Sequence, residues 1–209
     1  AFFAPGNQDA ARSALGLEDG PIVMFVGRLQ PLKGADLAIE MFAALGMENG
    51  TLLIVGGASG TSGNEEVRML KQQVKRMGIE PQVRLIPPQP HHILSTFYRA
   101  SDVVVVPSKS ESFGLVALEA AACGTPVVTA SVGGLQDLVV HGETGFLVDQ
   151  RDPKLYAHYA YQILKNPLLA AEMAMSAVEK AQQYSWSKTS EQVLAIYDSV
   201  TSKALVDCR

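Results

Sequence analysis

Short apolar runs recur along the chain and are separated by longer segments in which apolar residues follow a helical spacing. The first run, residues 22–26, is apolar at every position, which is typical of strands in a parallel sheet that is covered on both faces. The runs predict strands over residues 22–26, 52–55, 83–86, 103–106, 127–130 and 146–148.

The segments between the runs predict helices, and from Pro153 onward only helices are expected. The expected helices cover residues 7–17, 35–45, 64–77, 91–100, 115–123, 135–140, about 153–165, 167–183 and 187–202. Trp186 and Tyr197 are expected to pin the last helices onto the body of the fold. Strands that alternate with helices at this spacing predict right-handed βαβ units. The expected fold is therefore α/β, a doubly wound, Rossmann-like parallel sheet with C-terminal helices. We expect one domain over residues 1–209, with about 153–209 as a helical extension.

Ligands of a doubly wound sheet bind outside the carboxyl ends of its strands. The loops expected at that edge are 27–34, 56–63, 87–90, 107–114 and 131–135, and the Arg, Lys, Glu and Gly residues gather in them. The most informative stretch is 107–119, which runs from a buried strand through a Ser-rich turn with Gly114 into an apolar helix. Free backbone N–H groups at such a helix start favour an anion.

Two cations, Arg28 and Lys33, follow the first predicted strand in the segment GRLQPLKG. An arginine fork and a lysine point charge in one glycine-flanked loop can clamp a diphosphate. The alternative is a solvated loop whose charges have no specific ligand.

Two carboxylates, Glu111 and Glu119, bracket the turn in the 107–119 stretch. Glu111 can contact a ligand, or it can be a surface carboxylate that the helix dipole favours. Glu119 lies in a helix that is otherwise apolar, and an unpaired buried carboxylate costs several kcal/mol. Its partner is either a set of sugar hydroxyls or a structural donor, such as a backbone N–H or a lysine.

Other candidate motifs are weaker. The glycines of the 56–63 segment match neither GxGxxG nor a Walker sequence, so we expect a plain flexible loop there. The histidines at 91, 92, 141 and 158 show no metal-ligand spacing and are expected at the surface. No nucleophile elbow is present for a Ser/His/Asp triad.

Composition limits the choice of partners. The chain has 209 residues, 47% hydrophobic content and a formal net charge of -4, which argues against nucleic acid. Cys123 and Cys208 lie far apart in the sequence, so a disulfide framework is not expected. We therefore expect a reducing, cytoplasmic setting. No apolar run approaches the ~18 residues of a membrane span. The start has no signal peptide pattern and no Met, and is expected to be the interior of a longer chain.

Together these segments resemble a known family. GRLQPLKG, then YRASDVVVVPSKSESFGLVALEAAACGTPVV, then GG and GETGFLV, are similar to the donor half of a GT-B glycosyltransferase. The resemblance is strongest to the retaining enzymes of family 4, of the mycothiol-pathway and sucrose-phosphate synthase types. It covers essentially the whole chain, and its most specific part is the pairing of Glu111 and Glu119 with Phe113-Gly114 and the upstream cations.

The resemblance implies a role for each matching residue. Arg28 and Lys33 would hold the diphosphate of a nucleotide-sugar, and Glu111 would contact the transferred sugar; these three form the expected catalytic set. Glu119 would bind the ribose, the N–H groups around Gly114 and Leu115 the distal phosphate, and residues 86–89 the nucleobase. The expected donor-binding set is Gly27, Gln89, Ser112, Phe113, Gly114, Leu115 and Glu119. No metal or other cofactor is expected. The nucleoside diphosphate of the donor is expected to be UDP.

The resemblance also implies a partner. A GT-B enzyme reacts in the cleft between two Rossmann-like halves, so an N-terminal acceptor domain of the same full-length chain would be needed for catalysis. This chain alone is expected to be inactive. An epimerase of the same fold and a non-catalytic nucleotide-binding module remain open as alternatives, as do the acceptor, the sugar and the oligomeric state.

Overall fold

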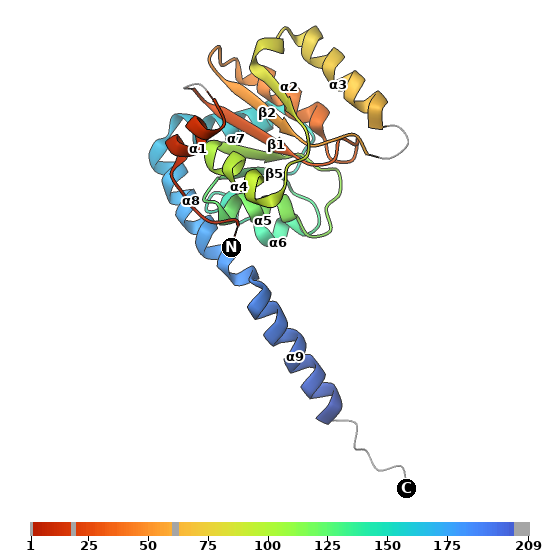
Figure 1. Ribbon diagram of the computed structural model, residues 1–209, viewed down its shortest axis with the longest axis vertical. Coiled ribbons are helices and arrows are strands. Elements are labelled where there is room, and N and C mark those ends of the chain that lie inside the picture. Colours follow the sequence, from red (N-terminus) through yellow and green to blue (C-terminus); the bar gives the residue numbers. More distant parts are fainter. Residues whose placement is uncertain (1, 18–19, 60–62, 203–209) are drawn as a thin grey trace.

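In the computed structural model, which describes residues 2–17, 20–59 and 63–202, six parallel strands form one sheet flanked by helices (Figure 1). The strands are β1 (Ile22–Val26), β2 (Thr51–Val55), β3 (Val83–Ile86), β4 (Val103–Val106), β5 (Val127–Ala130) and β6 (Gly145–Val148). The helices are α1 (Gln8–Ala14), α2 (Ala35–Leu45), α3 (Gly63–Met77), α4 (His91–Ala100), α5 (Leu115–Ala122), α6 (Leu135–Leu138), α7 (Pro153–Lys165), α8 (Pro167–Ala181) and α9 (Trp186–Ser202). Two 3₁₀ turns, η1 (Glu80–Gln82) and η2 (Gln182–Tyr184), complete the described elements. The strand order β3-β2-β1-β4-β5-β6 is that of a Rossmann fold, which confirms the expected fold class.

Both faces of the sheet are covered along β1, β2, β4 and β5, whereas the edge strand β3 is half-buried. Side chains alternate along β1, so that Val23 and Phe25 point into one core and Ile22 and Met24 into the other. The first core is completed by α2, α3 and α7, and the second by α4, α5 and α6. Helix α8 packs against both α5 and α7.

Asp102 ties helix α1 to the sheet at the amino ends of the strands. Its carboxylate accepts hydrogen bonds from the guanidinium of Arg12 at 2.8 Å and from the backbone N–H of Ile22 at 2.7 Å. The side-chain amide of Gln8 also donates to it. One carboxylate therefore connects α1, β1 and the start of β4.

The expected element boundaries hold to within a few residues, with two informative differences. Helix α1 begins after Asn7, whose side chain accepts from the N–H of Ala10 at 2.7 Å, and ends at Ala14, earlier than expected. Helix α8 ends at Ala181, and the 3₁₀ turn η2 replaces its expected last residues.

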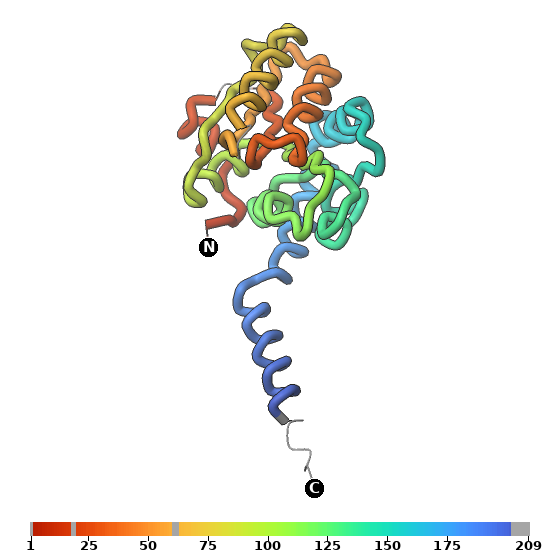
Figure 2. Tube along the Cα trace, turned by 90° about the vertical axis from the view of Figure 1, so that its right-hand side faces the viewer, coloured from red at the N-terminus to blue at the C-terminus, as the bar shows by residue number. Residues whose placement is uncertain are grey.

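The expectation that Trp186 and Tyr197 pin the last helix onto the body is wrong. Their side chains are 87% and 64% exposed, and α9 extends away from the sheet in both Figure 1 and Figure 2. Trp186, Val193, Ile196, Tyr197 and Val200 fall on one side of α9 and are all exposed. The amphipathic pattern is real, but within the described residues this apolar face has no partner.

Candidate functional site

The site lies where the strand order reverses, between β1 and β4. The loops that follow these two strands meet there, as expected for the topological switch point of a doubly wound sheet. The backbone N–H of Lys109 donates to the carbonyl oxygen of Leu32 at 2.8 Å, which joins the two loops directly. Gly34 allows this approach, because a Cβ there would overlap the carbonyl oxygen of Pro107.

Lys33 and Glu111 form an ion pair across this junction. The Lys33 Nζ atom lies 2.6 Å from Glu111 Oε2, and the two side chains are only 22% and 16% exposed. Most of the pair is withdrawn from water, so its attraction is stronger than that of a surface pair. The sequence placed both residues at one edge of the sheet but did not predict that they contact each other.

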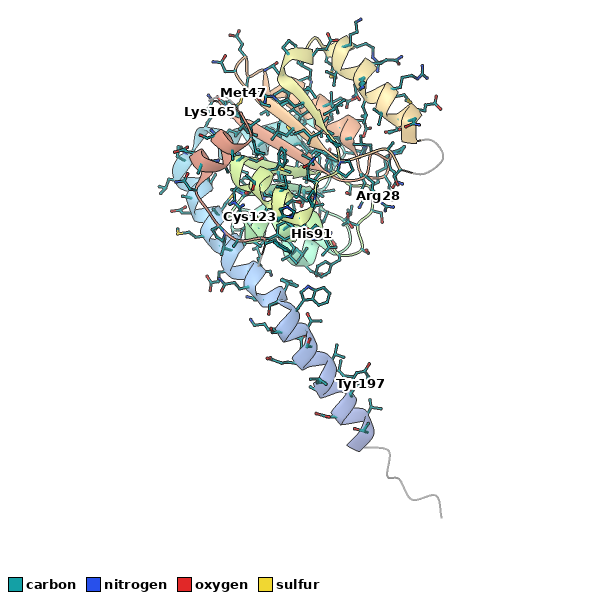
Figure 3. The ribbon with its side chains drawn as sticks, in the orientation of Figure 1. Arg28, Met47, His91, Cys123, Lys165 and Tyr197 are labelled. Carbon is teal, nitrogen blue, oxygen red and sulfur yellow. The ribbon has the colours of Figure 1, made fainter. Side chains whose placement is uncertain are left out.

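Arg28 lies in the same loop as Lys33, directly after Gly27. Its side chain is exposed, and in the part of the chain that the structure describes its guanidinium has no hydrogen-bond or ion-pair partner. In Figure 3, Arg28 lies on the opposite side of the fold from Met47, Cys123 and Lys165. Gly27 donates its N–H to the carbonyl oxygen of Val55 at 3.0 Å, which fixes the start of the loop.

Helix α5 begins at the same edge, and among the described residues the backbone N–H groups of its first turn have no hydrogen-bond acceptor. Gly114 precedes the helix with a φ of +99° and has no side chain that could cap it. Gly114 is buried, whereas Leu115, the first residue of the helix, is 62% exposed. Ser112 and Phe113 are also exposed, and the Phe113 ring makes an edge contact with Tyr184 at 5.9 Å between centroids. The arrangement can hold an anion next to Lys33.

The turn after β5 supports the Glu111 backbone. The N–H of Gly134 donates to the carbonyl oxygen of Glu111 at 3.1 Å, and a Cβ at Gly133 would overlap that same oxygen. The sequence predicted Gly133 and Gly134 only as a turn. Their close approach to Glu111 is what the two glycines make possible.

Arg151 supports the other end of the same loop, and sequence reasoning missed it. Its Nη1 atom donates to the carbonyl oxygen of Pro107 at 2.9 Å, and its Nη2 atom lies 2.9 Å from both carboxylate oxygens of Asp36. Because Arg151 follows β6 and Asp36 begins α2, no local motif connects them.

Glu119 accepts a hydrogen bond from Tyr98. The phenol Oη donates to Glu119 Oε2 at 2.8 Å, and Tyr98 is fully buried on α4. Burial raises the pKa of the Tyr98 phenol, and the neighbouring carboxylate raises it further, so the phenol keeps its proton and acts as the donor. Burial also raises the pKa of Glu119, while the Tyr98 hydrogen bond and the charge of His91 oppose that rise. The structural partner of Glu119 is therefore a tyrosine, not the backbone N–H or lysine that the sequence left open.

Gln89 lies beyond β3, at the edge of the sheet next to β2. It is half-buried, and its side-chain amide donates to the carbonyl oxygen of Pro87 at 2.9 Å, so it stabilises its own turn. Two backbone hydrogen bonds anchor the start of the loop that the sequence predicts to be flexible: the Gly56 N–H donates to the Ile86 carbonyl oxygen, and the Gly57 carbonyl oxygen accepts from the Leu29 N–H. A Cβ at Gly56 would overlap the Gly27 carbonyl oxygen, so this close approach requires glycine. Residues 60–62 of the loop lie outside the described part.

The histidines do not gather into a metal site. His141 pairs with the backbone of Leu147, His158 with Gln162, and His91 and His92 are exposed on α4. Among the residues that the structure describes, no group of three or more His, Cys, Asp or Glu side chains could hold a metal ion. Over the same residues, no helix has the length and apolarity needed to cross a bilayer.

One hollow, of about 510 Å³, lies at the amino ends of the strands, opposite the site. Its charged lining residues are already paired: Arg12 with Asp102, and Arg99 with Ser95, Thr96 and the carbonyl oxygen of Ala4. The carboxyl edge of the sheet, with its accessible Arg28 and open helix start, is therefore the better candidate site.

Residues 7–184 match the family model described as glycosyl transferases group 1. The chain belongs to this family. Relatives within the glycosyltransferases include the D-inositol 3-phosphate glycosyltransferases of Frankia alni, 46% identical over 98% of this chain, and of Acidothermus cellulolyticus, 48% identical over 94%. Solved structures with the same fold include sucrose-phosphate synthase from Thermosynechococcus elongatus, at TM-score 0.88 and 35% identity over 96% of this chain. HepE from Anabaena, solved in complex with UDP-glucose, has TM-score 0.87 and 28% identity over 95%. The resemblance to mycothiol-pathway and sucrose-phosphate synthase type enzymes is thereby confirmed.

The chain spans about half the length of these relatives. It covers 52% of the Frankia glycosyltransferase, 45% of the Acidothermus one, 50% of sucrose-phosphate synthase and 54% of HepE. The part of the relatives that it matches is therefore one half of a longer glycosyltransferase.

Proposed function

We propose that this chain is the donor-binding half of a retaining glycosyltransferase that moves a sugar from a UDP-sugar to an acceptor. The observation that carries the proposal is the Lys33–Glu111 pair beside the open start of helix α5, at the switch point of the sheet. A cation, a helix start and a carboxylate side by side match a diphosphate joined to a sugar. The UDP-glucose complex of HepE, a relative in structure, supports the choice of UDP.

Each side chain of the site has a place in the proposed donor complex. Arg28 and Lys33 hold the diphosphate, and the N–H groups at Gly114 and Leu115 bind its distal phosphate. Glu111 contacts the sugar hydroxyls, and Glu119 the ribose. The remaining contacts are backbone ones from Gly27 and Ser112, packing from Phe113, and a nucleobase pocket at residues 86–89 with Gln89.

The proposed chemistry is cleavage of the anomeric C–O bond through an oxocarbenium-like state. Negative charge develops on the leaving diphosphate, where Arg28, Lys33 and the helix start stabilise it. In this proposal the cations do the work that a metal does elsewhere, so chelators should leave the transfer rate unchanged.

The proposal requires a second half of the protein. The relatives are about twice as long as this chain, and α9 carries an exposed apolar face without a partner among the described residues. Such a face on a projecting helix is typical of an interface that the rest of the protein covers. We propose that the N-terminal half supplies this cover and the acceptor site, and that residues 1–209 alone do not catalyse transfer.

We also propose a reducing, cytoplasmic setting. Cys123 is a free, buried thiol, and burial raises its pKa to about 11, which is typical of an inert structural cysteine.

The test is a product analysis by NMR with the full-length protein, UDP-glucose or UDP-N-acetylglucosamine, and D-inositol 3-phosphate, the acceptor for which the relatives are named. Acceptor-dependent release of UDP with retention at the anomeric carbon supports the proposal. An epimerised sugar that stays attached to UDP would indicate the epimerase alternative. UDP binding without turnover of any UDP-sugar would indicate the non-catalytic module.

A further inference from the structure

Tyr98 is a buried phenol whose hydroxyl makes a single specific contact, with the carboxylate of Glu119. The ring is fixed from several sides: it is fully buried on α4, and Phe3 packs against it at 5.8 Å between centroids. Its backbone carbonyl also accepts from the hydroxyl of Thr125 at 2.8 Å, which ties this turn of α4 to the end of α5. The hydroxyl therefore reaches Glu119 from a position that cannot easily move.

This hydrogen bond leaves one side of the carboxylate open. Oε2 accepts from Tyr98 at 2.8 Å, and within the described ranges Oε1 has no hydrogen-bond donor. A carboxylate can accept several hydrogen bonds, and a ribose offers two neighbouring hydroxyls as donors. Glu119 is half-buried. If its carboxylate could rotate freely, donor binding would have to order it, and this would lower the affinity for the donor.

We propose that Tyr98 is a positioning residue that holds the Glu119 carboxylate toward the ribose hydroxyls and so favours ribonucleotide donors over 2′-deoxy donors. The inference rests on the proposed function, since it takes Glu119 as the ribose ligand. Tyr98 itself touches no donor atom; it acts through Glu119.

The ionisation of Glu119 also supports a positioning role for Tyr98. Burial disfavours the ionised form of Glu119, and the phenol hydrogen bond is the largest effect that opposes this. A protonated carboxyl would offer fewer acceptor sites to a diol. Tyr98 thus both orients the group and favours its ionised, accepting form.

The experiment compares UDP with 2′-deoxy-UDP by calorimetry on the full-length protein and three variants. Tyr98→Phe removes only the hydroxyl. Glu119→Ala removes the proposed ribose ligand. Tyr156→Phe is the matched control, because Tyr156 is also buried, at 1% exposed, but lies on α7, on the other face of the sheet.

The parent protein should bind UDP more tightly than 2′-deoxy-UDP. Tyr98→Phe should lower UDP affinity roughly tenfold, as for a lost hydrogen bond to a charged group, and leave 2′-deoxy-UDP affinity nearly unchanged. Glu119→Ala should remove the preference altogether, and Tyr156→Phe should change neither affinity. Thermal melting of each variant shows that it is folded.

Four results would overturn the inference, and they separate it from the proposed function. If Tyr98→Phe leaves UDP affinity unchanged while Glu119→Ala lowers it, Tyr98 does not position Glu119 and the proposed function stands. An equal loss for both nucleotides in Tyr98→Phe would make its role structural. If the parent protein does not bind UDP, the choice of UDP as the donor nucleotide is wrong. If Glu119→Ala does not change UDP affinity, the assignment of Glu119 to the ribose is wrong.

Discussion

Lys33 and Glu111 lie 78 residues apart in the chain, yet their charged atoms are 2.6 Å apart at the switch point of the sheet. Without a donor the two charges neutralise each other. A bound diphosphate would compete with Glu111 for Lys33, and the carboxylate would then be released toward the sugar. We expect this exchange to link donor binding to the placement of Glu111.

Replacing Glu111 by Gln tests this exchange. The neutral amide no longer competes for Lys33, so UDP affinity of the full-length protein should rise roughly threefold to tenfold. Sugar transfer should be lost, because the amide replaces one acceptor oxygen of the carboxylate by a donor NH₂ group and no longer accepts from the sugar hydroxyls in the same way. Calorimetry and a UDP-release assay measure the two effects. A parallel loss of UDP binding and transfer would instead move Glu111 from the sugar to the nucleotide.

Replacing Gly34 by Ala tests the junction of the two loops. Gly34 has a φ of +80°, and its Cβ would overlap the Pro107 carbonyl oxygen. Gly46 is the matched control, because it has a φ of +60° with nothing within 4 Å of its Cβ position. We expect Gly46→Ala to lower the free energy of unfolding by about 1 kcal/mol, and Gly34→Ala by at least about 3 kcal/mol. Similar values for both in denaturant titrations would show that the close approach is not required.

The sheet could be predicted from the sequence because its strands are short, largely apolar runs. The same runs identify which loops lie at the carboxyl edge, and Arg28, Lys33, Gly114 and Glu111 all lie there. Their roles as ligands remain predictions.

The contacts inside the site could not be predicted in the same way. Lys33 meets Glu111 because β1 and β4 are neighbours in the sheet, and this adjacency is set by packing between distant segments. Tyr98 looks like any core aromatic on an amphipathic helix, and only the structure shows its hydroxyl on Glu119. For α9, the amphipathic pattern indicated a buried face, but among the described residues this face is exposed.

Asp102 should contribute strongly to stability, because Arg12, Gln8 and the Ile22 N–H all donate to it. Asp102→Ala leaves these donors unpaired, and we expect a loss of about 2 kcal/mol in the free energy of unfolding. Arg68→Ala breaks a 3.4 Å pair with Glu65 in which both side chains are mostly exposed, and should cost less than about 0.5 kcal/mol. Denaturant titration of both variants measures the difference, and equal losses would contradict the assigned role of Asp102.

Cys123 should react slowly with alkylating reagents at pH 8. Burial raises its pKa from 9.0 to about 11, so its thiolate fraction is roughly 100-fold smaller than that of an ordinary thiol. Because the pKa is raised, reactivity should grow about tenfold per pH unit up to that pKa. Residues 1–209 with Cys208→Ser isolate this thiol, and the same variant in denaturant gives the reference rate. Equal rates in the folded and unfolded chain would show that Cys123 is accessible.

The diphosphate clamp is tested most directly by calorimetry of UDP binding to the full-length protein, its Lys33→Ala variant and a control. Lys71→Ala is the control, because Lys71 is exposed on α3, away from the loops that follow β1 and β4. Lys33→Ala should weaken UDP binding about tenfold to 100-fold, as expected for a lost charge-assisted contact with phosphate, and Lys71→Ala should leave it unchanged. Unchanged UDP affinity in Lys33→Ala would contradict the account.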